Sequence, residues 1–176
     1  SIMLLAETQL RYEERFSKKE LSELSQKVKK SAQQMLDFIV ALLDANSIET
    51  GTLNFTIASI HIFRVVQSVI DRHQNNAERK NITLDYSSVE KNIVALADFE
   101  RFGQVLDNLL SNAIKFTKQG IVTVELLKDA TFVIIKVKDT GIGISKDNLQ
   151  IIFDEFRQVS EGFGRGFEGV GLGLTI

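Results

Sequence analysis

A heptad pattern of apolar residues in the first third of the chain constrains the fold more than any other feature. Its members recur at alternating steps of three and four: Leu21, Leu24, Val28, Ser31, Met35, Phe38, Leu42 and Ala45. Ser17 and Glu20 have the spacing of a capping box, which predicts that a helix begins near Ser17. Such a helix has about 30 residues and is roughly 45 Å long. It is too long to be buried against one small domain.

A second apolar stripe joins the first toward the C-terminal end of this helix, at Ala32, Leu36, Ile39 and Leu43. Two adjacent stripes favour a helix that packs against several neighbours, as in a four-helix bundle. Residues 1–10 resemble the end of a preceding helix, and residues 11–16 the connection. We therefore expect residues 1–50 to form an incomplete helical hairpin that dimerises. A surface helix of one globular domain is the alternative.

The helical pattern breaks at Gly51, and residues 51–176 alternate between strand and helix patterns. The predicted strands lie at 53–57, 81–87 and 92–98, the predicted helices at 59–79, 99–116 and 147–153, and a β-hairpin at 121–138 with its turn near 128–131. This order predicts an α+β domain with helices on one face of the sheet.

Composition excludes several function classes. The chain of 176 residues has a formal charge of −2 and no long basic block, which argues against nucleic acid or an anionic membrane as its main partner. It has no cysteine, so disulfides and cysteine-based zinc sites are excluded, and this fits a cytoplasmic location. No apolar run reaches the length of about 18 residues that spans a membrane.

The predicted helix at 99–116 carries an unusual polar line. Asn108, Asn112 and Lys115 fall within an arc of about 60°. The opposite face is expected to hold Phe102, Leu106, Leu109, Leu110 and Ala113. A solvated face is the simplest explanation, but asparagine is a poor helix former. An amide oxygen suits Mg²⁺ and a lysine suits phosphate, so the line is a candidate binding site.

Two glycine-containing segments follow. Asp139, Gly141 and Gly143 form a D-x-G-x-G sequence directly after a predicted strand, which by itself is also typical of a tight turn. Eight of the eleven glycines lie between Gly141 and Gly173. Glycines let backbone N–H groups approach phosphates, although a glycine-rich loop alone is weak evidence.

Four motifs stand in the order found in one protein family. "NLLSNAIKF" resembles the N box, "DTGIGI" the G1 box, "IFDEFRQ" the F box and "GVGLGL" the G2 box of the ATP-binding catalytic domain of sensor histidine kinases, in the wider family shared with gyrase, mismatch-repair and heat-shock chaperone ATPases. "SAQQMLDFIVALLDANSIETG" is similar to the second helix of the dimerisation and phosphoacceptor hairpin of these kinases. The resemblance implies a two-layer α/β sandwich of the Bergerat type at 51–176, after a dimeric four-helix bundle.

The resemblance also implies residue roles. Asp139 would accept a hydrogen bond from the adenine amine, and Gly141 and Gly143 would let the backbone approach the base. Asn112 would ligate Mg²⁺ between the phosphates, with Asn108 assisting and Lys115 paired to a phosphate oxygen. The remaining implied ATP-site residues are Phe153 and Phe156 at the base of a lid, and Gly169, Gly171, Leu172 and Gly173 around the phosphates. Val170 stands where the family usually has a hydroxyl residue.

The function implied is that of an ATP- and Mg²⁺-dependent protein-histidine kinase core, which acts as a homodimer and supplies phosphate to a response regulator receiver domain. Residues 1–50 contain no histidine, so the phosphoacceptor is expected upstream of Ser1, and the closing helix and strands of the domain after Ile176. His61 and His73 lack a following acid and are expected to be ordinary surface or boundary histidines of the helix at 59–79. The alternatives are an ATPase of the same superfamily and a non-catalytic nucleotide-binding scaffold that acts through dimerisation.

Overall fold

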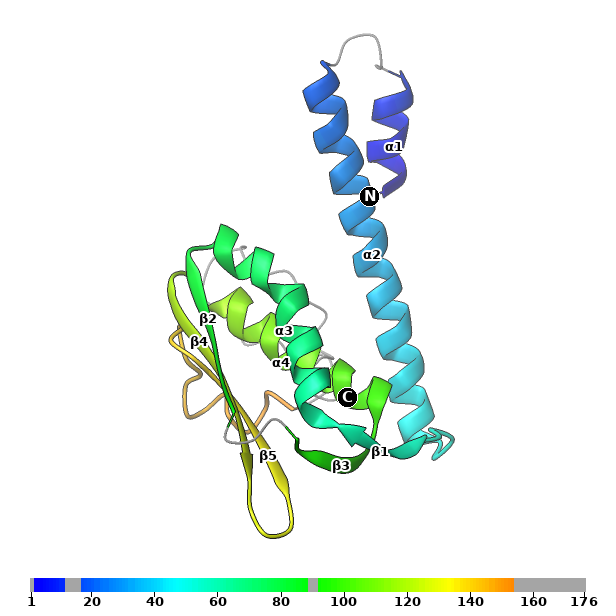
Figure 1. Ribbon diagram of the computed structural model, residues 1–176. Helices are drawn as coiled ribbons and strands as arrows, with labels where there is room; N and C mark the ends of the chain where they lie inside the picture. The colour runs from blue at the N-terminus through cyan, green and yellow to red at the C-terminus, as the bar shows by residue number, and fades with distance from the viewer. Residues whose placement is uncertain (1, 12–16, 89–91, 154–176) are drawn as a thin grey trace. The chain divides into compact units, whose positions relative to one another are not determined.

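The computed structural model describes residues 2–11, 17–88 and 92–153 (Figure 1). The chain divides into two compact units, Ser1–Leu53 and Asn54–Ile176. The boundary between the two units lies after Leu53, and the sequence predicts it at Gly51. No helix in the described ranges is long and apolar enough to cross a membrane.

The first unit is a pair of helices, α1 (Ile2–Arg11) and α2 (Lys18–Glu49), which lie side by side in Figure 1. The predicted capping box is present at the start of α2. The Ser17 N–H donates to Glu20 Oε2 at 2.8 Å, and the Glu20 N–H donates to Ser17 Oγ at 3.3 Å. After Thr50 the helix ends at Gly51, whose φ of 64° is easily adopted only by glycine.

The apolar stripes of α2 remain largely uncovered in the single chain. Six of their side chains are 36–57% exposed: Met35, Leu36, Phe38, Ile39, Leu42 and Leu43. A soluble helix rarely leaves so continuous an apolar surface in water. The helical unit therefore presents a surface suited to further helices.

The second unit is an α+β domain, as predicted. Its elements are β1 (Ile57–His61), α3 (Ile62–Arg79), β2 (Ile82–Ser88), β3 (Val94–Asp98), α4 (Phe99–Phe116), β4 (Gly120–Lys128) and β5 (Val133–Asp139). Strands β1 and β3 form an antiparallel pair, and a three-stranded sheet has the order β2-β4-β5, with β2 parallel and β5 antiparallel to β4.

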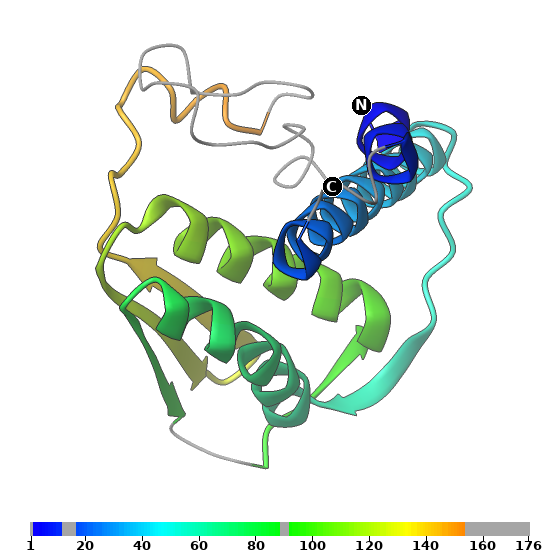
Figure 2. The ribbon, with the colours of Figure 1, turned by 90° about the horizontal axis from the view of Figure 1, so that it is seen from above.

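Helices α3 and α4 lie side by side on one side of the three-stranded sheet (Figures 1 and 2). Strand β4 is central, and its residues Val122, Val124 and Leu126 are fully buried. They form one core with the apolar faces of the helices, which include Val66, Val69, Leu106, Leu110 and Ile114. Burial of these faces holds α4 against the sheet and fixes which of its side chains remain accessible.

Three predicted elements are wrong in detail, and one of them is the helix predicted at 59–79, which begins at Ile62. The first strand lies at Ile57–His61 and not at 53–57, so Ser59, Ile60 and His61 extend a strand that was expected to have ended. The reason is tertiary: Ile60 is buried and pairs with Ala95 of β3. Residues 147–153 form hydrogen-bonded turns instead of a helix, as in the bond from the Leu149 N–H to the Ser145 oxygen. Asp147 and Asn148 are poor helix formers, which favours turns there.

Candidate nucleotide-binding site

Helix α4 carries three of the predicted site residues, Asn108, Asn112 and Lys115, and Asp98 caps its start. The Asp98 carboxylate accepts the backbone N–H groups of Arg101 and Glu100, each at 3.0 Å, and that of Thr56 at 2.8 Å. The Arg101 N–H in particular, then that of Thr56, holds the pKa of Asp98 below its usual value. This cap sets the register of the helix, and hence the direction of each later side chain.

The polar line of α4 lies at the edge of the buried core. Asn108, Asn112 and Lys115 are all partly buried, while Leu106, Leu110 and Ala113 behind them are buried. Leu109 was expected on the face opposite the polar line, but it is not buried with its neighbours there: the residue is 37% exposed. Lys115 Nζ stands 4.9 Å from the centroid of the Phe116 ring. Two amides and an ammonium group therefore line one partly covered side of the helix.

The D-x-G-x-G loop joins the C-terminal end of this helix. Asp139 is the last residue of β5, and its Oδ1 accepts the Gly141 N–H at 2.8 Å. The Ile142 N–H donates to the carbonyl oxygen of Phe116, the last residue of α4, at 3.4 Å. The structure thus brings Asp139 and the polar line of α4 to the same part of the domain.

The structure explains why both loop positions, Gly141 and Gly143, are occupied by glycine. A Cβ atom at Gly141 would lie 2.7 Å from the Phe116 carbonyl oxygen, and Gly143 has a φ of 68°. Neither glycine therefore needs a ligand to explain it. Asp139 is different: within the described part of the chain, no donor meets its Oδ2 atom, and this oxygen is available to a ligand.

The rest of the predicted site is only partly described. Phe153 is 61% exposed at the end of the turns that follow Ser145. Phe156, Gly169, Gly171, Leu172 and Gly173 lie outside the described residues. Among the residues that the structure does describe, no cluster of three His, Cys, Asp or Glu side chains is placed to hold a metal.

A polar cluster between α3 and α4 was not predicted from the sequence. Asp107 Oδ1 lies 3.2 Å from His73 Nε2 and 3.1 Å from Arg72 Nη2. The hydrogen bond from His73, followed by the charges of His73 and Arg72, holds the pKa of Asp107 below its usual value although partial burial opposes this. His73 is a boundary histidine, with 14% of its side chain exposed, and His61 is the exposed last residue of β1. Only the three-dimensional fold brings these residues together.

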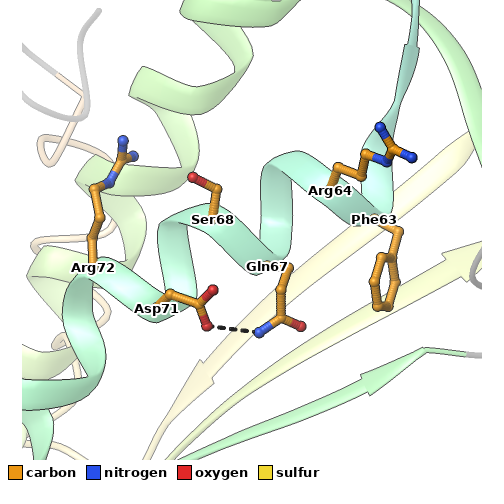
Figure 3. A pocket seen from close by; sticks show the side chains of 6 residues that line it. All are labelled: Phe63, Arg64, Gln67, Ser68, Asp71 and Arg72. Atoms are coloured by element: carbon orange, nitrogen blue, oxygen red, sulfur yellow. Dashed lines mark hydrogen bonds between the residues drawn. The ribbon is translucent and has the colours of Figure 1, made fainter.

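A separate open pocket of about 530 Å³ lies along α3 (Figure 3). It is lined by Phe63, Arg64, Gln67, Ser68, Asp71 and Arg72. Gln67 Nε2 donates to Asp71 Oδ1 at 2.8 Å across one turn of the helix. None of the predicted nucleotide-site residues lines this pocket, so it is not the site built by α4 and the loop after β5.

Residues 97–176 match the sequence model of a family described as "Histidine kinase-, DNA gyrase B-, and HSP90-like ATPase". The chain is 39% identical over 157 residues to the Non-motile and phage-resistance protein of Caulobacter vibrioides, a match that covers 86% of this chain and 18% of that protein. It is 36% identical over 148 residues to the Sensor histidine kinase RcsC of Escherichia coli, covering 83% of this chain and 16% of RcsC. The chain spans less than a fifth of the length of these two relatives.

Solved structures share the fold. Full-length ShkA in complex with AMPPNP matches 97% of this chain and 35% of its own, with a TM-score of 0.74 and 24% identity. The histidine kinase AdeS of Acinetobacter baumannii matches 99% of this chain and 79% of its own, with a TM-score of 0.74 and 17% identity. The histidine kinase ThkA in complex with the response regulator protein TrrA matches 89% of this chain and 46% of its own, with a TM-score of 0.61 and 19% identity.

Proposed function

We propose that this chain is the Mg-ATP-dependent kinase core of a two-component sensor. Residues 97–176 match the histidine kinase-, DNA gyrase B- and HSP90-like ATPase family, and sensor histidine kinases are among the relatives of the chain. The observation that carries the proposal is the junction of α4 with the loop after β5. There the carbonyl oxygen of Phe116, which directly follows the polar line of α4, accepts a hydrogen bond from the N–H of Ile142. Ile142 belongs to the same loop as Asp139. One site thus combines groups suited to a base with groups suited to phosphates.

The side chains of this site fit the chemistry of Mg-ATP. Asp139 Oδ2 would accept a hydrogen bond from the amine of adenine, since only Oδ1 is used by the Gly141 N–H. The amide oxygens of Asn112 and Asn108 suit Mg²⁺, and Lys115 suits a phosphate oxygen. Bound Mg²⁺ would neutralise the charge that develops on the phosphates during transfer.

The proposed reaction needs positioning and charge neutralisation more than a nucleophile of the site itself. The acceptor would be a histidine of the dimerisation hairpin, which residues 1–50 do not contain. The phosphoryl group would then pass to a response regulator receiver domain. The solved complex of ThkA with TrrA, which has the same fold, supports a partner of this class.

We further propose that the helical unit forms a homodimer. The exposed apolar side chains of α2 support this, because a second copy would present the same stripes and both could be buried in a four-helix bundle. The proposal assigns the six stripe residues from Met35 to Leu43 to the bundle core.

Each of the two alternative functions differs from the proposed kinase in one property. An ATPase of the same superfamily resembles this chain but carries a catalytic glutamate where Asn108 stands, and an amide cannot act as the general base for water. A non-catalytic scaffold would dimerise without any effect of Mg²⁺ on nucleotide affinity.

Calorimetric titration of the chain with ATP tests the proposal, in MgCl₂ and in EDTA. We expect ATP to bind in MgCl₂ and to bind at least about tenfold more weakly in EDTA, because Mg²⁺ held by Asn112 would offset the negative charge of the phosphates. Binding that EDTA does not change would support the scaffold. Steady phosphate release without transfer to an added histidine-bearing hairpin would support the ATPase.

A further inference from the structure

The side chain of Lys80 contacts the C-terminal end of α4, which is the end that joins the candidate site. It follows α3 directly, as its C-cap, and its Nζ donates to the carbonyl oxygen of Ile114 at 2.9 Å and to that of Lys115 at 3.4 Å. The sequence separates Lys80 from these residues by β2, β3 and most of α4. Only the fold places this cation at the helix end.

These contacts complete the hydrogen bonding of the last turn of α4. The last four carbonyl groups of a helix lack a partner within the helix. Here the Thr117 N–H meets the Ala113 oxygen at 3.1 Å, Lys80 meets the oxygens of Ile114 and Lys115, and the Ile142 N–H meets that of Phe116. Lys80 therefore donates to two of these four carbonyls, and its positive charge also compensates the negative end of the helix dipole.

The same turn holds both halves of the candidate site together. It carries Asn112 and Lys115 on its polar side, and its final carbonyl holds the loop of Asp139 and Gly141. A change in the direction of the Ile114 and Lys115 peptides would move the side chains of the polar line and the Phe116 carbonyl as well. The loop after β5 would move with that carbonyl.

We propose that Lys80 is a positioning residue of the nucleotide site, which fixes the last turn of α4 against the loop after β5. It acts through Lys115 and Phe116 and not by contact with the nucleotide. This inference rests on the proposed nucleotide-binding function.

The test compares three variants of the chain: Lys80→Met, Lys80→Arg and Lys128→Met. Methionine keeps most of the apolar stem and removes the charge, while arginine keeps the charge and its donors. Lys128 ends β4 at the hairpin and serves as the control for the loss of one positive charge. Mg-ATP affinity is measured by calorimetry at a temperature where circular dichroism shows each variant to be folded.

We expect Lys80→Met to bind Mg-ATP about tenfold more weakly, because hydrogen bonds from a charged donor are lost. Lys80→Arg should stay within about threefold of the parent chain, since it can reach the same carbonyls. Lys128→Met should bind as the parent does. Unchanged affinity in Lys80→Met, or an equal loss in Lys80→Arg or Lys128→Met, overturns the inference.

A second readout needs no nucleotide and separates this inference from the proposed function. In ¹H–¹⁵N spectra of the free chain, Lys80→Met should shift the amide signals of Gly141 and Ile142, and Lys128→Met should not. A parent chain that binds no ATP refutes the proposed function, and the amide shifts then decide alone whether Lys80 positions the loop. Absence of those shifts overturns the inference.

If Lys80→Met does not fold, Lys80→Gln, which keeps an uncharged donor, takes its place in both measurements.

Discussion

At the scale of single residues, Asn112 is the most direct test of the metal assignment. It is partly buried on the polar side of α4, next to the buried Ala113. We expect Asn112→Ala to lower Mg-dependent ATP affinity by at least about a hundredfold, because a metal ligand is lost. The free energy of unfolding should change by no more than about 1 kcal/mol, because the side chain is not part of the core.

Ser111→Ala is the matched control for this substitution, since Ser111 is exposed on the same turn of α4. It should leave ATP affinity unchanged. A folded Asn112→Ala variant that keeps the Mg-ATP affinity of the parent would remove Asn112 from the site.

Asp139 tests the adenine assignment. Its Oδ1 is used by the Gly141 N–H, and a base amine would have to use Oδ2. In Asp139→Asn the amide can turn a donor toward the amine, so ATP affinity should fall by about tenfold. Competition titrations with ATP and GTP measure whether the loss is selective for adenine. An equal loss for both nucleotides argues against contact with the amine, and the exposed Asp147→Asn serves as the control.

The sequence could predict the candidate residues themselves but not all of their surroundings. The polar line could be predicted from helical geometry alone. Asn108, Asn112 and Lys115 share one side of α4 regardless of how deeply the helix is buried. The exposure of Leu109 did not follow, since it depends on how far α4 is rotated against the sheet. The need for glycine at Gly141 likewise arises from the Phe116 carbonyl, which is distant in sequence.

At the scale of elements, the contact of Asp107 with α3 predicts a pH dependence of stability. The pKa of Asp107 is lowered in the folded chain, first by the hydrogen bond from His73. The ionised carboxylate therefore stabilises the fold above the ordinary aspartate pKa of about 3.9. This contribution is lost as the pH falls from that value through the lower pKa of the folded state.

The comparison of Asp107→Asn with the parent chain measures this contribution. Urea unfolding should show the variant to be less stable near neutral pH, and the difference should become smaller below about pH 4. Asp71→Asn, which changes an exposed acid bonded within α3 itself, should show a smaller difference. A difference for Asp107→Asn that is constant down to about pH 2 would contradict the assignment.

Elements with strong local signals were predicted best. Helix α4 has the predicted bounds, 99–116, because Asp98 caps it and its apolar residues repeat with the helical period. Strand β1 was misplaced because its pairing with β3 decides its position, and the residues Ile57–His61 alone do not. The turns at 147–153 contain the apolar residues of a helix, but Asp147 and Asn148 favour local bonds.

At the scale of the whole molecule, the apolar stripes of α2 predict a dimer. Light scattering at high micromolar concentration should give the mass of two chains. Leu36→Glu combined with Ile39→Glu should weaken association by at least about tenfold, because two charges would enter an apolar interface. Lys29→Glu, on an exposed part of the same helix, is the control. A monomeric parent chain at this concentration would contradict the bundle.

This chain is also expected not to phosphorylate itself. Its two histidines lie in the α/β unit, and residues 1–50 contain none. His61 ends β1, and His73 is largely covered with Nε2 beside Asp107. Incubation with γ-labelled ATP should therefore give less than about one hundredth of the acid-labile label of a chain that includes an acceptor histidine. Acid-labile label mapped to His61 or His73 would overturn this prediction.

The parallel pairing of β2 with β4 has a consequence for the order of folding. Ile82 pairs with Gly120, and β3 and α4 lie between them in the chain. The hairpin of β4 and β5 closes a short loop and can form within microseconds, whereas the β2–β4 pair must close a loop that contains all of α4. The hydrogen bonds of Asp107 with His73 and of Lys80 with Ile114 each span 34 residues, a similar separation. We therefore expect the candidate nucleotide site to assemble late in folding, after the hairpin that carries Asp139 has formed.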